Sequence, residues 1–471
     1  MGLFFYPRGG SARVARYLSR ALQVLGWPVT LACGSLGEAG ALGDAATVFR
    51  GVDILPARYD DAVARWARGE DPMEAPFPMH PSFEARPGVP DRAFPWVSPE
   101  QGMRMASAWA ALLGGSDAMA QSRLLHLHHL TPLHEAVELS LPDLPVITHL
   151  HGTELKMLDA IQREVPAILG PHAEWWAGRM RRSAGRAAAT ITISPHDQQE
   201  AVRLLGLDPE TVHSIPNGVD IDHFAPHQPS AEERRAHWLR WLVSDPRGWN
   251  EATSRPGSIR YTEREVIDGF SDPETGEALP VLMYVGRFLA FKRVPLLIRA
   301  YARARRRMSV PAPLVIWGGW PGEWEEEHPH TVVTREGVSG VFFDGWRDHD
   351  ELPLGLSCAD CFVAPSTDEP FGLVYLEAMA CGLPVIATRS GGPPSFINVT
   401  PGEPDGWLVP PDDERALAEA MVSAVDDHAE RSRRAANAHR HARQSYSWRH
   451  AAGEVIGLYQ RHAPRTRRRA G

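Results

Sequence analysis

The sequence has few cysteines, no excess of positive charge and no long apolar run. Four cysteines in 471 residues are too few for a disulfide framework. Cys358 and Cys361 form a C-x-x-C pair, but no second pair or nearby histidine cluster completes a zinc site. Packed thiols are therefore the favoured interpretation. The formal net charge of −9 argues against a nucleic-acid or anionic-membrane partner.

Membrane and export signals are also lacking. No run of about 18 apolar residues is long enough to span a bilayer, so no transmembrane segment is expected. The opening MGLFFYPRGG has no basic segment followed by a long apolar core, so we expect no signal peptide and a cytoplasmic location. With 43% hydrophobic and 23% charged residues, the composition is that of a globular protein, and its length predicts two or three domains.

The first residues show a strand, a glycine turn and a helix in succession. The apolar run Leu3 to Tyr6 predicts a buried strand, and Gly9-Gly10-Ser11 follows it. Apolar residues then recur at helical spacing from Val14 to Leu25, which begins a doubly wound α/β domain. A long irregular excursion is expected at residues 56–100, which are rich in proline. Further strands are predicted within residues 124–130, 145–152, 189–195 and 213–220.

A second alternation of strands and helices follows an interruption. Residues 228–279, which hold three tryptophans and many charges, predict an insertion with a small helical part. Right-handed strand–helix crossovers would place the strands that follow it in one parallel sheet. Those strands are predicted within residues 280–288, 313–319, 340–346, 360–366 and 383–388, and helices within 414–425 and 446–460.

The most informative stretch is EPFGLVYLEAMACGLPVIAT, from Glu369 to Thr388. Glu369 and Glu377 lie eight positions apart and flank a glycine turn and a helix start. Unpaired N–H groups at a helix start can bind an anion. Acceptors for sugar hydroxyls and donors for phosphate therefore lie in one segment, a combination that suits a nucleotide sugar.

This stretch resembles the donor-binding signature of the retaining GT-B glycosyltransferases of family four, the group 1 enzymes that include glycogen-synthase-like and sucrose-synthase-like proteins. The shared pattern is Glu, seven residues, Glu, then Ala-Met-Ala-x-Gly-x-Pro-Val. The resemblance implies an α/β GT-B fold, with two doubly wound Rossmann-like domains facing across a deep cleft. Residues 1–215 would bind the acceptor, with 446–471 packing back on them, and residues 216–445 would bind the nucleotide sugar.

Two cations lie near the end of a predicted strand in YVGRFLAFKR. Arg287 follows the strand by one glycine, and Lys292 lies five residues later. Fixed cations at a strand end can stabilise the negative charge that develops on a diphosphate leaving group. Their spacing is similar to the family's Gly-Arg-x-x-x-x-Lys, which implies that both bind the donor diphosphate.

The resemblance also assigns the remaining donor contacts. Glu377 would bind the ribose hydroxyls, and Glu369 would face the transferred sugar. Further donor contacts would come from the N–H groups of Phe371, Gly372, Leu373 and Val374, from the base-binding segment Gly345, Trp346 and Arg347, and from Gly10 near the phosphate. His151 matches a family histidine that contacts the transferred sugar.

Other polar residues of the first half are candidates for the acceptor side. These are Gly9, Ser11, His128, His129 and His149. For His128 and His149, a satisfied buried histidine is an equal alternative. Four histidines, with His151, also suggest a metal site, but the resembled family needs no metal.

The expected reaction is transfer of a sugar from a nucleotide diphosphate with retained configuration, without a metal or other cofactor. The base rates of the family favour a UDP-sugar, then a GDP-sugar. The acceptor, a small molecule or a lipid-linked sugar, and the oligomeric state stay open. A nucleotide-sugar epimerase is an alternative, although no acid–base pair for it is evident. A non-catalytic nucleotide-sugar binder is another, but the retained cations and glutamates argue against it.

Overall fold

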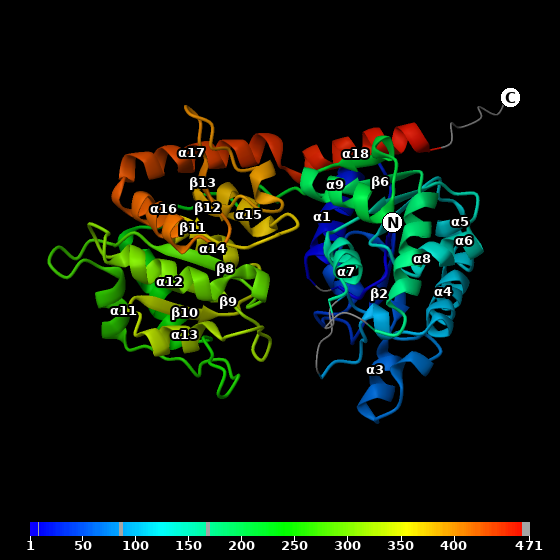
Figure 1. The fold of residues 1–471 in the computed structure, drawn as a ribbon, viewed down its shortest axis with the longest axis horizontal. Coiled ribbons are helices and arrows are strands. Elements are labelled where there is room, and N and C mark those ends of the chain that lie inside the picture. Colours follow the sequence, from blue (N-terminus) through cyan, green and yellow to red (C-terminus); the bar gives the residue numbers. More distant parts are fainter. Residues whose placement is uncertain (8, 84–87, 166–169, 464–471) are drawn as a thin grey trace. The chain divides into compact units, whose positions relative to one another are not determined.

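The computed structural model describes residues 1–7, 9–83, 88–165 and 170–463, and the chain forms two compact units (Figure 1). The first contains residues 1–218 and the segment from Trp448 onward, and the second contains Val219–Ser447. The sequence places the domain boundaries at 215/216 and 445/446, a few residues earlier in each case. Each unit is described by itself.

The first unit is built on a seven-stranded parallel sheet with the strand order β3-β2-β1-β4-β5-β6-β7. The chain leaves β1 toward one edge and returns at β4 to build the other half. A reversal of this kind separates the loops that follow the two central strands and opens the usual ligand position of such sheets. The strands are β1 (Gly2–Leu3), β2 (Thr30–Ser35), β3 (Asp53–Arg58), β4 (Leu125–His128), β5 (Val146–His149), β6 (Ala189–Thr192) and β7 (Val212–Ser214).

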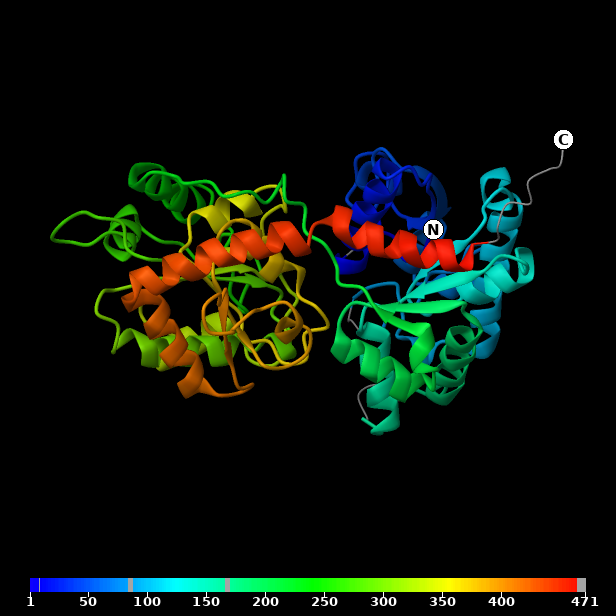
Figure 2. The same ribbon diagram turned by 90° about the horizontal axis from the view of Figure 1, so that it is seen from above.

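The helices of this unit include one from the far end of the chain. The last helix, α18, packs against α1 (Figure 2). The Tyr17 and Trp448 rings of these helices stack with centroids 5.7 Å apart. The α-helices are α1 (Gly9–Val24), α2 (Ala45–Val48), α3 (Asp60–Ala67), α4 (Pro99–Gly114), α5 (Asp117–Ala120), α6 (Leu133–Ser140), α7 (Thr153–Gln162), α8 (Ala173–Arg186), α9 (Pro195–Leu205) and α18 (Trp448–His462). Short 3-10 turns lie at η1 (Pro72–Glu74), η2 (Phe94–Trp96) and η3 (Pro209–Thr211).

The prediction of an irregular excursion over residues 56–100 is wrong at both ends of that range. Strand β3 extends to Arg58, α3 follows it, and α4 begins at Pro99. Pro56 suggests a break because it has no N–H to donate. Strand β3 is the edge of the sheet, however, so the missing donor leaves no neighbouring strand unpaired. Residues 84–87 lie outside the described residues.

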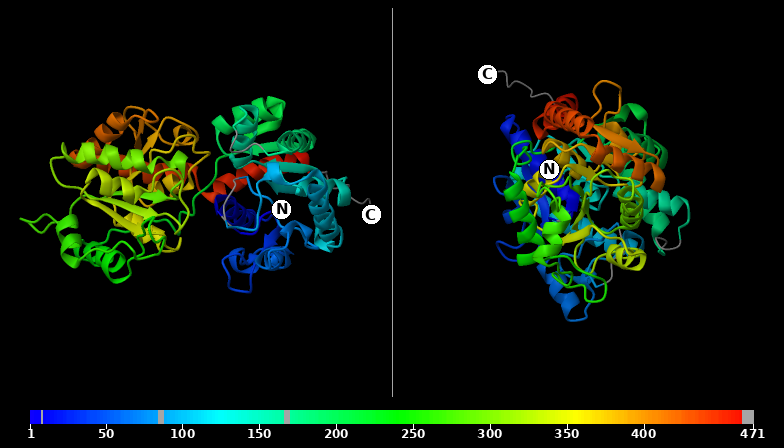
Figure 3. Two further views of the ribbon diagram at one scale, coloured as in Figure 1. Left: turned by 60° about the horizontal axis from the view of Figure 1, so that its bottom comes forward. Right: turned by 90° about the vertical axis from the view of Figure 1, so that its left-hand side faces the viewer.

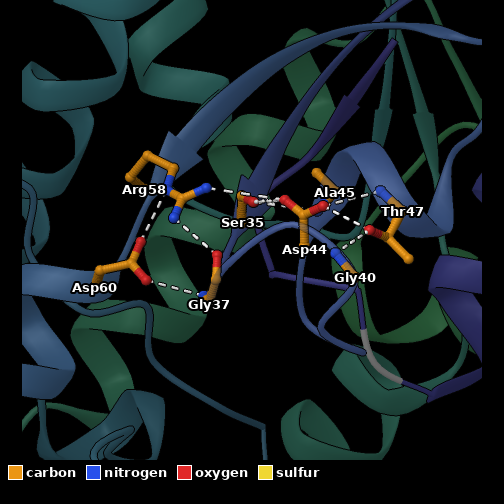
Figure 4. Close-up of polar contacts among 8 residues, drawn as sticks. All are labelled: Ser35, Gly37, Gly40, Asp44, Ala45, Thr47, Arg58 and Asp60. Atoms are coloured by element: carbon orange, nitrogen blue, oxygen red, sulfur yellow. Dashed lines mark hydrogen bonds and ion pairs between the residues drawn. The ribbon is translucent and has the colours of Figure 1, made fainter.

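A polar network fixes the loop between β2 and α2 at the carboxyl edge of this sheet (Figure 4). Asp44 caps α2 by accepting hydrogen bonds from the Thr47 N–H at 3.0 Å and hydroxyl at 2.7 Å, which hold the pKa of Asp44 below its usual value. Asp60 accepts from the Gly37 N–H at 2.9 Å and from Arg58 at 2.8 Å. Arg58 donates to the Gly37 carbonyl. The loop is therefore anchored to both β3 and α2.

The second unit is built on a six-stranded parallel sheet with the order β10-β9-β8-β11-β12-β13. Its strand order reverses between β8 and β11, and Figure 3 shows helices over its faces. The strands are β8 (Leu282–Gly286), β9 (Leu314–Gly318), β10 (Val341–Gly345), β11 (Cys361–Val363), β12 (Val385–Thr388) and β13 (Gly406–Val409). The helices are α10 (Ala231–Leu239), α11 (Glu263–Phe270), α12 (Val294–Arg305), α13 (Pro329–Glu336), α14 (Leu352–Ser357), α15 (Leu373–Ala380), α16 (Glu414–Asp426) and α17 (His428–Ser445), with a π turn at η4 (Arg240–Ser244) and 3-10 turns at η5 (Ala290–Lys292) and η6 (Pro393–Ser395).

The insertion at 228–279 is part of the core of the second unit. It contains α10, η4 and α11, which confirms the predicted helical part. Trp241 packs edge-on against Trp317 of β9, with ring centroids 5.1 Å apart, and Phe270 packs on Phe342 of β10 at 4.8 Å. Its three tryptophans, Trp238, Trp241 and Trp249, are buried. The insertion therefore covers the β9–β10 side of the sheet.

Two further predictions concern the cysteines and membrane-spanning segments. Cys358 and Cys361 are buried free thiols, as predicted. Burial raises the pKa of the Cys358 thiol to about 12, so it stays protonated. Among the described residues, no helix combines the length and apolar character needed to cross a bilayer.

The stability of the first unit should depend on the protonation of Asp197 at the start of α9. Burial raises the pKa of this carboxyl from 3.8 to about 7, so the folded state binds a proton that the unfolded state has released between these values. The contribution of this group to stability is greatest below pH 3.8 and is lost as the pH rises to 7. Asp197→Asn should therefore stabilise the protein more at pH 8 than at pH 5, by about 2–3 kcal/mol. Urea unfolding at both pH values measures this difference, and equal gains at the two would contradict it.

Candidate functional site

The loop from Glu369 to the start of α15 has a backbone that only glycine permits at one position. Gly372 precedes α15 with a φ of +91°, and a Cβ atom there would lie 2.5 Å from the Tyr375 ring. Leu373 is the first residue of the helix. The N–H groups that begin a helix have no carbonyl partner four residues earlier, so those of Leu373 and Val374 can bind an anion, whereas the Tyr375 N–H donates to the Gly372 carbonyl at 3.1 Å. The predicted helix start is confirmed.

Lys292 and Glu369 form an ion pair, although 77 positions separate them in the sequence. Their side chains are 14% and 10% exposed. Lys292 ends the turn η5 that follows β8, and Glu369 follows β11, the neighbouring strand. The Thr367 N–H donates to the Phe291 carbonyl at 2.7 Å and holds the two loops together. The pair therefore lies where the strand order of the sheet reverses.

A second loop supports Glu369 from the other side. The Gly392 N–H donates to the Glu369 carbonyl at 2.7 Å. At Gly391, whose φ is +67°, a Cβ atom would lie 2.4 Å from the same carbonyl oxygen. This close approach of two backbones requires glycine and fixes the position of Glu369.

Glu377 lies on α15, and its side chain is buried rather than solvated, as predicted. His349, which follows β10, places its Nε2 atom 3.0 Å from a carboxylate oxygen of Glu377. Sequence reasoning missed His349. Its position three residues after the strand predicted within 340–346 was the available signal, because such positions gather at the carboxyl edge of the sheet. The contact orients the carboxylate that the resemblance assigns to ribose.

Arg287 stands at the end of β8, where glycine brings two strands together. The Tyr284 hydroxyl donates to the Arg287 carbonyl at 2.9 Å. Gly319 donates to the Gly286 carbonyl, and at Gly318, with φ +123°, a Cβ atom would be 2.3 Å from that oxygen. Burial raises the pKa of Tyr284 well above 10, and the nearby Glu369 charge adds to the effect. Its hydroxyl therefore remains a donor that fixes this turn.

The segment Gly345-Trp346-Arg347 is arranged differently from the other predicted donor contacts. The Arg347 side chain is fully buried and pairs with Asp344, and it also pairs with Asp245 of the insertion at 3.0 Å. Burial raises the pKa of Asp344 to about 6, although the guanidinium acts in the opposite direction. The Arg347 guanidinium is thus occupied inside the unit, so this residue has only its backbone left for a nucleotide base.

In the first unit, Gly9, Gly10 and Ser11 form the first turn of α1, which follows β1. Gly9 has a φ of +72°. A Cβ atom added at Gly10 would meet no described atom within 4 Å. Packing therefore does not require glycine at Gly10, which leaves room for a ligand at the backbone.

The predicted histidines of the first unit are brought together at the ends of β4 and β5. His128 and His149 are direct neighbours across the two strands, and His151 follows β5. The His128 Nδ1 and His151 Nε2 atoms are 2.9 Å apart. His129, with a φ of +63°, places Nδ1 3.2 Å from Glu154, a buried carboxylate in the first turn of α7.

Sequence reasoning missed two members of this group, His126 and Glu154. The His126 Nε2 atom lies 3.1 Å from His149 Nδ1. An H-x-H pattern on a strand was the available signal for His126, because alternate residues share one face. Burial opposes ionisation of Glu154, but the charge and hydrogen bond of His129 keep its pKa below the usual value. Burial lowers the pKa of His149 to about 3 and that of His128 and His151 well below 6.5, so these rings are neutral.

Two family models match the chain, one in each unit. Residues 270–441 match "Glycosyl transferases group 1", and residues 8–223 match "Glycosyltransferase Family 4". Glycogen synthase of Mycobacterium tuberculosis is 26% identical over 466 residues, which are 96% of this chain and 91% of that protein. These matches extend along nearly the whole sequence.

Two other relatives are more similar over shorter segments. The lipopolysaccharide core biosynthesis glycosyltransferase LpsE of Rhizobium meliloti is 36% identical over 193 residues, 41% of this chain and 53% of that protein. A D-inositol 3-phosphate glycosyltransferase of Stackebrandtia nassauensis is 31% identical over 277 residues, 58% of this chain and 53% of that protein. The chain thus spans about half the length of these two relatives.

Solved structures define the fold class. Sucrose-phosphate synthase from Thermosynechococcus elongatus superposes with a TM-score of 0.63 at 20% identity and 98% coverage of both chains. HepE of Anabaena, in complex with UDP and glucose, gives a TM-score of 0.63 at 17% identity, again with 98% coverage of both. The fold is therefore GT-B, as predicted. With the two family models, this assigns the chain to the group 1, family 4 glycosyltransferases.

Replacing Arg347 should mainly reduce the stability of the second unit and not its affinity for a ligand. Arg347→Met leaves the buried Asp344 without its cation, and we expect a loss of about 3–5 kcal/mol in the free energy of unfolding. Arg299→Met, which removes an exposed ion pair with Glu336, is the matched control and should cost about 1 kcal/mol or less. Urea unfolding measures both. Normal stability with lost nucleotide affinity in Arg347→Met would instead place this guanidinium in the donor site.

Proposed function

We propose that this protein transfers a sugar from a nucleotide-diphosphate sugar to an acceptor, with retention of the anomeric configuration. The observation that carries the proposal is the contact between Lys292 and Glu369 beside the open start of α15. A cation for phosphate, a carboxylate for sugar hydroxyls and free N–H groups for an anion thus meet at one edge of one sheet. Glu377, on the same helix, adds a carboxylate for the ribose.

The role proposed for each residue follows from the charge of its side chain. Arg287 and Lys292 bind the donor diphosphate and stabilise the charge that grows on it as the glycosidic bond breaks. No divalent metal is assigned to this step, because the two side chains supply the positive charge. Glu369, held by the Gly391-Gly392 backbone, orients the transferred sugar. His151 of the first unit is proposed to contact that sugar, and His128, His129 and His149, with Gly9 and Ser11, to line the acceptor side.

The donor is proposed to be a UDP-sugar, with a GDP-sugar as the next candidate. The HepE structure, whose fold this chain shares, contains UDP and glucose, which supports a uridine donor for this type of fold. The names of the relatives refer to carbohydrates and polyols as different as lipopolysaccharide core, glycogen and D-inositol 3-phosphate. The acceptor class proposed here is accordingly a sugar or polyol hydroxyl, free or lipid-linked.

A screen of nucleoside diphosphates by thermal shift, followed by incubation with the matching nucleotide sugars and a panel of sugar and polyol acceptors, tests the proposal. Formation of a glycoside with the anomeric configuration of the donor supports it. Conversion of the donor to an epimer, or tight binding without transfer or hydrolysis across the panel, would overturn it.

Lys292 should be needed for the chemical step. Lys292→Ala removes charge stabilisation in the transition state and should reduce kcat by on the order of a hundredfold or more. Arg299→Ala, which removes a half-exposed cation of the same unit, should retain near-normal turnover. Steady-state assays with the donor identified by the screen compare the two variants. Equal rates for Lys292→Ala and the parent protein would show that the diphosphate is held elsewhere.

The two glutamates should separate nucleotide binding from sugar orientation. Glu377→Gln weakens the bond to the ribose and should raise the Kd for the bare nucleoside diphosphate by on the order of tenfold to a hundredfold, since a hydrogen bond to a charged group contributes about 1.5–3 kcal/mol. Glu369→Gln should leave that Kd nearly unchanged and reduce transfer, because the sugar is no longer oriented. Calorimetric titration of both variants makes the comparison. The reverse pattern would exchange the two roles.

A further inference from the structure

We infer that the first unit binds a divalent transition-metal ion through the imidazoles of His126, His128 and His149, and that this ion ties β4 to β5. One ring nitrogen from each of these three side chains lies within 4.8 Å of the others. All three side chains are buried. The site is separate from Lys292, Glu369 and Glu377 of the second unit. For His128 and His149, a structural ion replaces the acceptor-side role proposed above.

The sheet itself creates the arrangement. His126 and His128 are alternate residues of β4 and therefore share one face. Parallel pairing sets His128 directly opposite His149 of β5. The ring centroids of His126 and His149 lie 5.2 Å apart, as do those of His128 and His149. The three rings are thus fixed by backbone register and not by flexible loops, which is the preorganisation that a metal site needs.

The separation of two of the nitrogens already fits a ligand set. His126 Nε2 and His149 Nδ1 are 3.1 Å apart. With metal–nitrogen bonds of about 2.0–2.1 Å, neighbouring ligands of a tetrahedral zinc ion lie about 3.3 Å apart. Small rotations of the rings would therefore admit the ion. Three histidines are a common protein ligand set for zinc, with the fourth position left to water or another side chain.

Two ring nitrogens of the cluster lack a hydrogen-bond partner among the described residues. These are His128 Nε2 and His149 Nε2, and both atoms are buried. A buried polar atom without a partner is costly, because it has lost its bonds to water. The neutral imidazole ring is the form that binds a metal. A cation held by His126 Nε2, His149 Nδ1 and His128 Nε2 would give the last of these atoms the partner that it lacks.

The surroundings supply the outer contacts that metal-bound histidines usually have. His126 places its second nitrogen, Nδ1, 2.6 Å from the Tyr459 hydroxyl of α18. His128 Nδ1 is 2.9 Å from His151, whose ring stacks on His149. Such contacts fix the ring orientation and the tautomer of a ligand. The buried Glu154 accepts from the His151 N–H at 3.2 Å and brings a negative charge close to the group.

The ligand chemistry selects the ion. Neutral imidazole nitrogens suit Zn²⁺, Cu²⁺ or Ni²⁺, whereas Mg²⁺ and Ca²⁺ require oxygen ligands. Zn²⁺ is the assigned ion, because three histidines with one further position form a known zinc ligand set.

Cobalt and zinc titrations of tag-free, chelator-treated full-length protein test the assignment. One equivalent of Co²⁺ should give the intense visible d–d absorption of a four-coordinate site. Zn²⁺ at about a hundred times its Kd should displace that signal and raise Tm by on the order of 5 °C. No absorption and no shift in Tm, or an effect of Mg²⁺ equal to that of Zn²⁺, would overturn the proposal.

Substitutions locate the ion. His126→Gln and His149→Gln should each reduce Co²⁺ affinity at least tenfold. The matched control is His134→Gln, which alters another buried histidine of the same unit, one that is hydrogen-bonded to Thr148. It should leave Co²⁺ affinity unchanged. Equal binding by the parent protein and both ligand variants would place the metal elsewhere and overturn the proposal.

Zinc-edge X-ray absorption of the parent protein gives an answer even if the ligand variants do not fold. A first shell containing three or more imidazole nitrogens supports the site. A first shell dominated by oxygen atoms overturns it, because the cluster offers no carboxylate among its three ligands.

Discussion

The ion pair between Lys292 and Glu369 depends on the reversal of strand order between β8 and β11. These neighbouring strands send their following loops in different directions, and the two charged residues meet in the gap. Neither side chain could be buried alone at acceptable cost, because an unpaired charge loses its hydration. The glycine contacts at Gly372 and Gly391 and the backbone bond between Thr367 and Phe291 all act to hold the loops in the geometry that this pair needs.

The sheet of the first unit also has a reversal of strand order, but different types of residue lie beside it. Its strand order reverses between β1 and β4, and the glycine turn of Gly9 and Gly10 follows one strand while His128 ends the other. Here buried imidazoles and the carboxylate of Glu154 take the place of the cation–carboxylate pair. The cluster at the ends of β4 and β5 is thus an unusual concentration of metal-binding groups within an otherwise ordinary parallel sheet.

Much of the fold could be predicted because its elements carry local signals. Apolar runs bounded by glycine and proline predicted most strands of both sheets, and the Glu369–Glu377 segment predicted a glycine turn followed by a helix. The errors arose where local signals depend on the neighbours. Pro56 suggested irregular chain, but it lies in an edge strand, and the tryptophan-rich insertion gave no sign that it covers β9 and β10.

The sequence by itself determined the two parallel sheets, the family resemblance and the types of residue at the candidate site. These properties are encoded within segments of about 20 residues, where periodicity and turn chemistry act. Only the tertiary structure decided which side chains meet: Lys292 with Glu369, His349 with Glu377, and His126 with a tyrosine 333 positions away. It also decided that the Arg347 guanidinium is buried against Asp344 and Asp245 of the insertion. Such pairings depend on strand order and packing between distant segments, which no local pattern of residues records.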